Sequence, residues 1–119
     1  MKLAIVGSRG FNDYEFLREK ILDLIEENEI VVNEIVSGGA KGVDTLAEEF
    51  AEDLDYEITV FEADWKGLGR KAGPLRNTQI VEYSDILVAF WDGESRGTLD
   101  SITKAKSLGK EVHIIKTSK

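Results

Sequence analysis

The sequence predicts an α/β protein in which a parallel sheet is covered by helices on both faces. Two observations carry this prediction. Apolar runs typical of buried strands recur along the chain, and each run is followed by a segment with apolar residues at helical spacing. The chain has 119 residues, of which 42% are hydrophobic, and this suits one domain with its own core. We therefore expect residues 1–119 to form a single domain.

The first half of the chain predicts two strands and two helices. Lys2–Gly7 is a continuous apolar run and predicts a buried strand. Asp13 is suited to cap the helix that follows, and Glu34–Ser37 predicts a short second strand. Gly42–Leu54 predicts the second helix. The apolar stripes of these helices are Phe16, Leu17, Ile21, Leu24 and Ile25, and then Val43, Leu46, Ala47, Phe50, Ala51 and Leu54.

The second half continues the alternation. Glu57–Ala63 alternates apolar with polar residues and predicts a third strand. Pro74 suits the first turn of a helix that runs to about Tyr83. Asp85–Trp91 predicts a fourth, buried strand. Gly97–Leu108 predicts the last helix, which Gly109 ends, and Glu111–Lys116 predicts the fifth strand.

Strict alternation of strand and helix predicts a parallel sheet with right-handed crossovers. We expect a Rossmann-like three-layer α/β/α sandwich with strand order 3-2-1-4-5. Ligands of such sheets bind at the carboxyl ends of the strands, where the strand order reverses. The loops that follow Gly7, Ser37, Ala63 and Trp91 should therefore face one another.

The charge distribution predicts a small anion site in an acidic protein. The formal net charge is −8 and the sequence pI is about 4.7, which argues against a protein that coats DNA or RNA. From Asp44 to Asp64 there are nine acids and no Lys or Arg. From Trp65 to Gln79 there are four bases and no acid. The alternative is a solvated basic patch without a ligand.

Two of the loops join a strand to a helix through glycines, as a phosphate cradle requires. The segment Ser37–Asp44 contains three glycines, and Trp91–Thr98 contains two. Neither is a G-x-G-x-x-G or a Walker A motif. Asp44 is suited to cap backbone amides or to accept a hydrogen bond from a ribose hydroxyl. The alternative for Ser37–Asp44 is a tight structural turn between strand and helix.

The other two loops supply side chains for the same pocket. In the first, Gly7 permits close approach of a ligand. Ser8 offers a hydroxyl, and Arg9 offers a guanidinium that can donate two hydrogen bonds to a phosphate. The segment Asp64–Asn77 is interpreted as a mobile basic loop that closes over an anion. Trp65 is suited to stack on a base or to pack in a core or an interface.

Several chemistries are excluded or disfavoured. The chain has no Cys, and its one His, His113, lies in the fifth predicted strand, away from the loops. No residues have metal-ligand spacing, and no serine has a nearby His for a nucleophilic triad. We expect no metal and no cofactor. No signal peptide or membrane-spanning run is evident, so we expect a cytoplasmic protein without a membrane partner.

The four loops and the starts of the helices after them carry a recognisable set of short segments. These are Gly7-Ser8-Arg9 with Phe11 and Asp13, Ser37-Gly38-Gly39-Ala40 with Gly42 and Asp44, Asp64-Trp65 with Gly67, Ala72-Gly73 with Arg76-Asn77, and Phe90-Trp91-Asp92-Gly93 with Ser95 and Gly97-Thr98. Together they resemble the SLOG superfamily, and most closely its YspA/YpsA-related branch. This resemblance implies a Rossmann-like fold that binds nucleotides, nucleotide-derived signals or, in some members, nucleic acid. The superfamily includes the LOG phosphoribohydrolases and the DNA-processing protein A family.

The resemblance to the LOG enzymes is incomplete at the residue that would support catalysis. Those enzymes have a catalytic Arg eight residues before a Ser-Asp pair, and Arg76 matches this position. Their catalytic Glu is replaced here by Ser101. Asp100 is one residue away and would point about 100° around the helix. Asp92 or Asp44 could substitute for the missing carboxylate, but the sequence does not select between them.

Three functions follow as hypotheses. The first is a module that binds a phosphate-bearing nucleotide or nucleotide-derived small molecule. The second is a nucleotide hydrolase that uses Arg76, and the third, which the net charge disfavours, is a single-stranded nucleic-acid binder. The family likeness also makes a homodimer possible. The predicted ligand-binding residues are Gly7, Ser8, Arg9, Phe11, Ser37, Gly38, Gly39, Ala40, Gly42, Asp44, Asp64, Trp65, Arg76, Asn77, Trp91, Asp92, Gly93, Ser95, Gly97 and Thr98.

Overall fold

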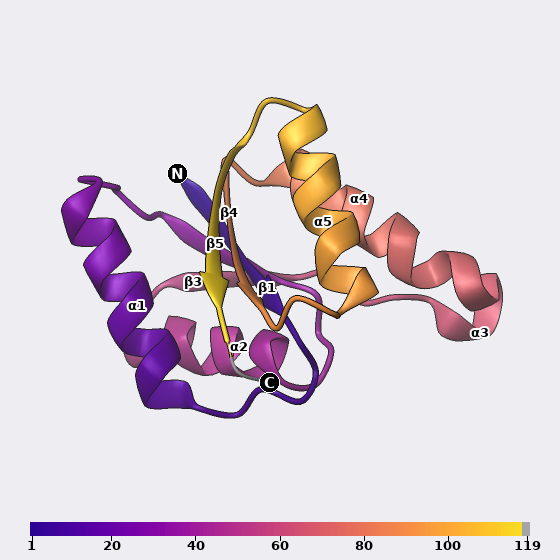
Figure 1. Ribbon diagram of the computed structural model, residues 1–119, viewed down its shortest axis with the longest axis horizontal. Helices are drawn as coiled ribbons and strands as arrows, with labels where there is room; N and C mark the ends of the chain where they lie inside the picture. Colours follow the sequence, from indigo (N-terminus) through magenta and orange to yellow (C-terminus); the bar gives the residue numbers. More distant parts are fainter. Residues whose placement is uncertain (118–119) are drawn as a thin grey trace.

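Five parallel strands form one sheet in the order β3-β2-β1-β4-β5, as the alternation of elements predicts (Figure 1). The structure is a computed structural model and describes residues 1–117. Every neighbouring pair of strands is parallel. Strand order therefore reverses between β1 and β4. The strands are β1 Lys2–Gly7, β2 Glu34–Ser37, β3 Glu57–Val60, β4 Ile86–Trp91 and β5 Glu111–Lys116.

Helices cover both faces of the sheet and complete the predicted three layers (Figure 1). Asp13 caps the first helix as predicted, because its Oδ1 accepts from the backbone N–H of Phe16 at 3.1 Å. The helices are α1 Tyr14–Glu27, α2 Val43–Asp53, α3 Trp65–Leu68, the 3-10 turn η1 Gly69–Lys71, α4 Ala72–Tyr83 and α5 Arg96–Ser107.

Alternate residues of each strand supply two separate cores. In β1, Leu3 and Ile5 pack with α1 and α2, whereas Ala4 and Val6 pack with α4 and α5. The same alternation continues in β4. This arrangement follows from the period of two along a strand, and it explains why the strands are apolar on both sides.

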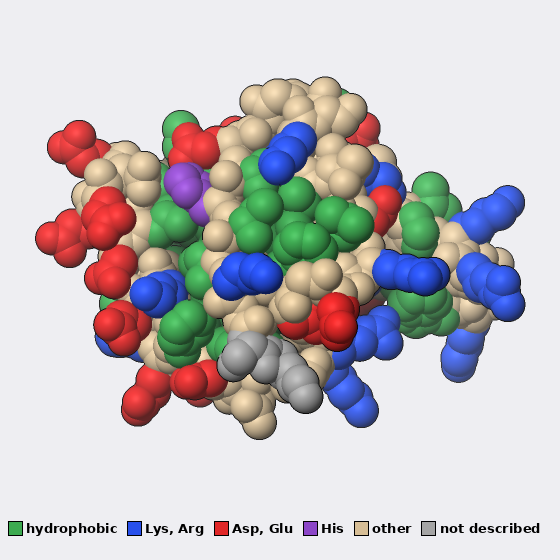
Figure 2. Space-filling view, viewed as in Figure 1, with side chains coloured by type: hydrophobic (Ala, Val, Ile, Leu, Met, Phe, Trp, Pro, Cys, Tyr) green, Lys and Arg blue, Asp and Glu red, His purple; other side chains and the backbone are tan. Residues whose placement is uncertain are grey.

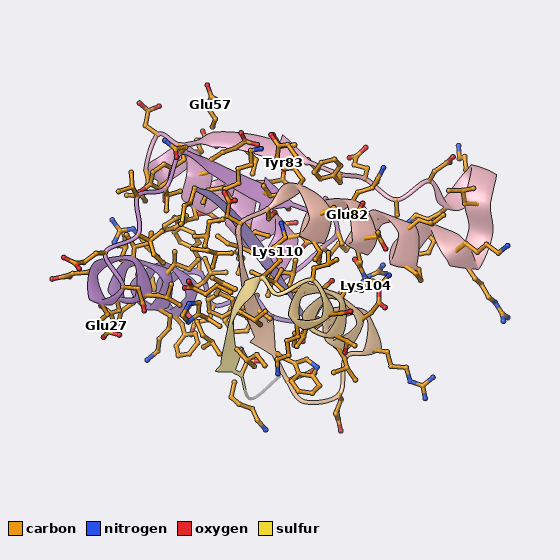
Figure 3. All side chains as sticks on the ribbon, turned by 90° about the horizontal axis from the view of Figure 1, so that it is seen from above. Glu27, Glu57, Glu82, Tyr83, Lys104 and Lys110 are labelled. Carbon is orange, nitrogen blue, oxygen red and sulfur yellow. The ribbon has the colours of Figure 1, made fainter. Side chains whose placement is uncertain are left out.

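Long-range hydrogen bonds fix α4 and α5 against the sheet and against each other. Figure 3 labels the three donor residues, Tyr83, Lys104 and Lys110. The Nζ of Lys104 in α5 donates to the carbonyl of Pro74 in α4 at 2.7 Å. At the other end of α4, the Nζ of Lys110 donates to the carbonyl of Ser84 at 2.7 Å. The hydroxyl of Tyr83 donates to the carboxylate of Glu34 in β2 at 2.6 Å. Both ends of α4 are therefore anchored.

The third strand is shorter than predicted. It ends at Val60 rather than at Ala63, because its neighbour β2 ends at Ser37, which is paired with Val60. Beyond this pair, the N–H of Phe61 still donates to the carbonyl of Ser37 at 2.9 Å, but no further residue of β2 is available.

The segment predicted as a basic loop is helical in part. Asp64 caps α3, because its Oδ1 accepts from the N–H of Gly67 at 3.0 Å. The turn η1 then leads directly into α4, which begins at Ala72. Pro74 still lies in the first turn, where its missing N–H breaks no helical hydrogen bond.

Charge is divided between the two ends of the molecule. Figure 2 shows Asp and Glu side chains gathered on the side of α1, and Lys and Arg side chains around the projecting α3. The bases of this projection, Lys66, Arg70 and Lys71, are exposed. Within residues 1–117, no helix has the length and apolar character needed to cross a membrane.

Candidate functional site

A cavity of about 600 Å³ lies where the strand order reverses. Loops after β1, β2 and β4 contribute to it, together with the start of α2 and with α3, α4 and α5. This is the position that the parallel topology predicts for a ligand site. The lining residues are Val6, Gly7, Ser8, Arg9, Gly10, Ala40, Asp44, Trp65, Gly73, Pro74, Arg76, Asn77, Ile80, Asp92, Ser95, Arg96, Gly97, Thr98, Asp100 and Ser101.

The loop after β1 places a hydroxyl and a guanidinium at the cavity. The N–H of Ser8 donates to the carbonyl of Phe90 at 3.2 Å, and the carbonyl of Ser8 accepts from the N–H of Val43 at 3.3 Å. Its Oγ is buried and has no hydrogen-bond partner within residues 1–117. Arg9 is exposed, and its guanidinium lies 5.9 Å from the centre of the Trp65 ring.

The loop before α2 is closed by its own hydrogen bonds. Oδ2 of Asp44 accepts from the N–H of Ala40 at 3.2 Å, and Oγ of Ser37 donates to the carbonyl of Asp44 at 3.0 Å. Gly42 has a φ of +76°, and a Cβ there would lie 2.4 Å from the carbonyl oxygens of Ser8 and Arg9. The glycine therefore lets α2 pack against the loop after β1.

Arg76 is a buried cation on the cavity wall. Its side chain is only 9% exposed. Nη1 donates to the carbonyl of Gly38 at 2.5 Å, and Nε donates to Oδ1 of Asn77 at 3.0 Å. Among residues 1–117, no carboxylate lies within the 4.0 Å that defines an ion pair with this guanidinium. Burial lowers the pKa of Arg76, and the nearby Asp44 opposes that effect.

The start of α5 presents backbone amides to the cavity. Oγ of Ser95 caps the helix by accepting from the N–H of Thr98 at 3.4 Å. Oδ1 of Asp92 accepts from the N–H groups of Glu94 and Ser95, both at 2.8 Å, and these bonds lower the pKa of Asp92. Within residues 1–117, the N–H groups of Arg96 and Gly97 donate to no protein group. This helix end is thus open to a ligand. At the start of α2, by contrast, the N–H of Val43 donates to the carbonyl of Ser8 at 3.3 Å.

Asp44 faces the cavity as a buried acid. It is 7% exposed, and burial raises its pKa to about 6, although the hydrogen bond from Ala40 and the charge of Arg76 act in the opposite direction. A methyl group on Gly38 would lie 2.7 Å from Oδ2 of Asp44 and 2.8 Å from Nη1 of Arg76. The carboxylate and the guanidinium therefore share one small region beside Gly38.

Trp65 lies at the edge of the cavity and is 50% exposed. Its ring packs over α4, where a Cβ on Gly73 would be 3.0 Å from Cη2 of the indole. The exposed part of the ring is available for stacking. Trp91, by contrast, is turned away from the cavity, because its Nε1 donates to the carbonyl of Ser95 at 3.0 Å and its ring packs on the α4–α5 core.

The structure thus brings together many of the predicted site residues but not all. Those on the cavity wall are Gly7, Ser8, Arg9, Ala40, Asp44, Trp65, Arg76, Asn77, Asp92, Ser95, Gly97 and Thr98. The remaining ones shape the surrounding loops. Phe11, for example, is buried and stacks on Phe90, with ring centres 5.9 Å apart. The predicted residues outside the wall are Phe11, Ser37, Gly38, Gly39, Gly42, Asp64, Trp91 and Gly93.

Sequence reasoning missed part of the α5 contribution. Asp100 was expected to point away from the position of Ser101, yet both residues line the cavity. Oδ2 of Asp100 accepts from Nδ2 of Asn77 at 3.1 Å and pairs with Nζ of Lys104 at 2.9 Å. The signal for both was their spacing of three and four residues after Gly97, which places them on one helix face. The other wall residues that were not predicted are Val6, Gly10, Gly73, Pro74, Ile80 and Arg96.

The described part of the chain shows no metal centre. No group of three or more His, Asp or Glu residues within residues 1–117 is placed to hold an ion. His113 lies in β5, where its Nε2 is 2.6 Å from Oε2 of Glu111. His113 does not line the cavity, and its strand β5 lies at the edge of the sheet.

Comparison with known proteins identifies relatives of the whole chain. Residues 1–67 match the family model described as "YspA, cpYpsA-related SLOG family". The Gene 61 protein of Mycobacterium phage D29 is 31% identical over 114 residues, which cover 91% of this chain and 90% of the phage protein.

Solved structures share the fold. DNA processing protein A from Streptococcus pneumoniae superposes with a TM-score of 0.75 and 22% identity, over 98% of this chain and 50% of that one. The corresponding protein from Helicobacter pylori gives 0.67 and 22%, over 96% of this chain and 64% of that one. This chain therefore spans about half of the length of the pneumococcal protein. The family match and the phage relative together establish that the chain belongs to the YspA, cpYpsA-related SLOG family.

Proposed function

We propose that the protein binds a phosphate-bearing nucleotide or nucleotide-derived ligand in the cavity at the strand-order reversal. The observation that carries this proposal is that Arg76 is buried and unpaired with any carboxylate among residues 1–117. Its guanidinium lies on the cavity wall, and no carboxylate in that part of the chain is within 4.0 Å of it. A buried cation is stable when an anion pairs with it. Arginine side chains also commonly bind phosphate in a bidentate manner, which supports this role for Arg76.

The start of α5 supports a phosphate site beside Arg76. The N–H groups of Arg96 and Gly97 have no protein acceptor within residues 1–117, and a Cβ on Gly97 would meet nothing within 4 Å. Free amides and the helix dipole together favour an anion at this end. The buried Oγ of Ser8, which has no partner in the described chain, lines the same cavity.

The cavity also suits the rest of a nucleotide. Its volume of about 600 Å³ is within the range of small-ligand pockets. The exposed part of the Trp65 ring offers a stacking surface for a base. Membership of the SLOG family, some of whose members bind nucleotides, agrees with this assignment.

A second candidate function is hydrolysis of the bond between base and sugar. The observation that favours it is Asp44, a buried carboxyl group whose pKa burial raises to about 6 and which lies on the same wall as Arg76. Such perturbed acids are typical of catalytic sites. In this reaction water would add to C1′ of the sugar, the C1′–N bond would break, and the base would leave with a proton. Asp44 would stabilise the positive charge that develops on the sugar.

A thermal-shift screen tests the binding proposal. The probes are mononucleotides, dinucleotides, cyclic dinucleotides and a short single-stranded oligonucleotide. A ligand present at about 100 times its Kd should stabilise the protein by about 2.7 kcal/mol, which raises Tm by several degrees for a domain of this size. Stabilisation by a mononucleotide or dinucleotide supports the proposal. Stabilisation by the oligonucleotide alone contradicts it and indicates nucleic-acid binding. Release of free base from a nucleoside monophosphate would establish the second candidate.

A further inference from the structure

The cavity wall contains three carboxylates, although the proposed ligand is an anion. Two of them are satisfied by the protein. Asp92 accepts from two backbone N–H groups at 2.8 Å. Asp100 accepts from Nδ2 of Asn77 and pairs with Nζ of Lys104 at 2.9 Å. These two acids therefore need nothing from a ligand.

Asp44 differs from the other two because its hydrogen bonding is incomplete. Oδ2 accepts from the N–H of Ala40 at 3.2 Å, and Oδ1 accepts from no group within residues 1–117. No Lys or Arg in that part of the chain lies within 4.0 Å of the carboxylate. A buried carboxylate requires hydrogen-bond donors. The free oxygen on the cavity wall is thus suited to a donor that the ligand supplies.

The position of Asp44 indicates which part of a nucleotide supplies this donor. A methyl group on Gly38 would lie 2.7 Å from Oδ2 of Asp44 and 2.8 Å from Nη1 of Arg76, so the carboxylate and the guanidinium border the same small region. If Arg76 binds phosphate, the group beside it is the one joined directly to the phosphate, which is the sugar. The base lies further along the ligand, where the exposed ring of Trp65 borders the cavity. The donors of a ribose are its 2′- and 3′-hydroxyl groups, and the 2′-hydroxyl is the one that a 2′-deoxynucleotide lacks.

We propose that the protein binds ribonucleotides in preference to 2′-deoxynucleotides, because Asp44 accepts a hydrogen bond from the ribose 2′-hydroxyl. This inference rests on the proposed nucleotide-binding function. Buried polar groups that are left unpaired discriminate strongly against ligands that lack the matching group. The carboxylate, which is charged at pH 8, is a stronger acceptor than a neutral group.

The test compares matched nucleotides by isothermal titration calorimetry at pH 8. The probes are the four ribonucleoside 5′-monophosphates, their 2′-deoxy counterparts and their 2′-fluoro-2′-deoxy counterparts. For each base that binds, we expect Kd of the deoxy compound to be larger by about tenfold to a hundredfold. The fluoro compound should bind as weakly as the deoxy compound, because fluorine occupies the position of the hydroxyl but donates no hydrogen bond.

Variants connect the preference to Asp44. In Asp44→Ala, the ratio of the two Kd values should fall close to one, and in Asp44→Asn, which keeps one acceptor oxygen, it should be intermediate. Glu52→Gln is the matched control, since Glu52 is exposed on the same helix and its replacement should leave the ratio unchanged. Thermal melting of each variant verifies that it is folded.

Three results would overturn the inference. Equal binding of the ribo and deoxy compounds to the wild-type protein removes the preference itself and leaves nucleotide binding intact. A ratio that persists in folded Asp44→Ala shows that a different group contacts the hydroxyl. Tight binding of the fluoro compound shows that the hydroxyl acts as an acceptor. Failure of every nucleotide to bind is a separate result, which rejects the proposed function as well.

Discussion

Asp44 and Arg76 lie side by side on the cavity wall without forming an ion pair. Both approach the Cα of Gly38 so closely that a methyl group there would be 2.7 Å from the carboxylate and 2.8 Å from the guanidinium, yet no N···O distance between them is within 4.0 Å. Both charged groups are buried, and neither forms an ion pair with another residue of the described chain. A ligand that carries both an anion and a donor would satisfy both residues at once.

The narrow space at Gly38 leads to a first prediction. Gly38→Ala should weaken nucleotide binding and lower the free energy of unfolding by about 1–3 kcal/mol, because the added methyl group displaces Asp44 or Arg76. Chemical denaturation and calorimetry measure the two effects. Gly109→Ala is the control for lost stability alone, since Gly109 is not on the cavity wall and its φ of +71° strains an alanine, so this variant should bind the nucleotide as tightly as the wild-type protein. An unchanged affinity in Gly38→Ala would show that the geometry beside Gly38 does not matter for binding.

The buried carboxyl group of Asp44 predicts a pH dependence of stability. Its pKa is about 6 in the folded protein and about 3.9 in an unfolded chain. Between these values the folded state binds more protons than the unfolded state, so Asp44 makes the protein less stable as the pH rises through this window. Above pH 6 this destabilisation amounts to about 3 kcal/mol.

Asp44→Asn removes the ionisation and tests this prediction. The free energy of unfolding of the variant minus that of the wild-type protein should rise from pH 4 to pH 7, because only the wild-type protein is destabilised as Asp44 ionises. Urea denaturation at a series of pH values measures the difference, and Glu52→Gln controls for the loss of one surface charge. A difference that does not change with pH would mean that the pKa of Asp44 is not raised by folding.

The half-exposed indole of Trp65 leads to a prediction about binding. Trp65→Ala should weaken binding of a nucleotide by about 1–3 kcal/mol, the range for a base stacked on an aromatic ring. Trp91→Phe leaves Trp65 as the one tryptophan, so fluorescence quenching by the nucleotide then reports on this ring. If quenching is absent although calorimetry shows binding, the base does not stack on Trp65.

The cap of α5 leads to a prediction about stability. Ser95→Ala removes the hydroxyl that accepts from the N–H of Thr98, and the free energy of unfolding should fall by about 0.5–2 kcal/mol. Ser95→Asp retains a capping acceptor and should restore most of this loss. Thermal denaturation of both variants measures the effect. Equal stability of Ser95→Ala and the wild-type protein would show that Asp92 alone supports this loop.

The sheet and the location of the cavity could be predicted from the sequence because the signals for both are local and repeated. Each strand is an apolar run, each helix has its own stripe, and strict alternation restricts the topology to few choices. The end of β3 could not be predicted in this way, because it depends on the point at which β2 stops. A limit set by a neighbouring strand is absent from the local pattern.

The details of the site were harder to predict for a similar reason. Glycines at 67, 69 and 73 with nearby bases are typical of a loop, but the cap at Asp64 and packing of Trp65 over Gly73 give helical turns. Trp91 follows a strand just as a site residue would, and only its hydrogen bond to the carbonyl of Ser95 turns it away. Orientation of these side chains depends on tertiary contacts.

Phosphate binding by Arg76 can be measured in one calorimetric comparison. Each nucleoside 5′-monophosphate that binds is titrated beside its nucleoside, with the wild-type protein and with Arg76→Ala. In the wild-type protein the monophosphate should bind more tightly than the nucleoside. In the variant this advantage should fall by about 1.5–3 kcal/mol, the contribution of a charged hydrogen bond. Equal affinity of monophosphate and nucleoside for the wild-type protein, or an advantage that is undiminished in folded Arg76→Ala, would contradict the account.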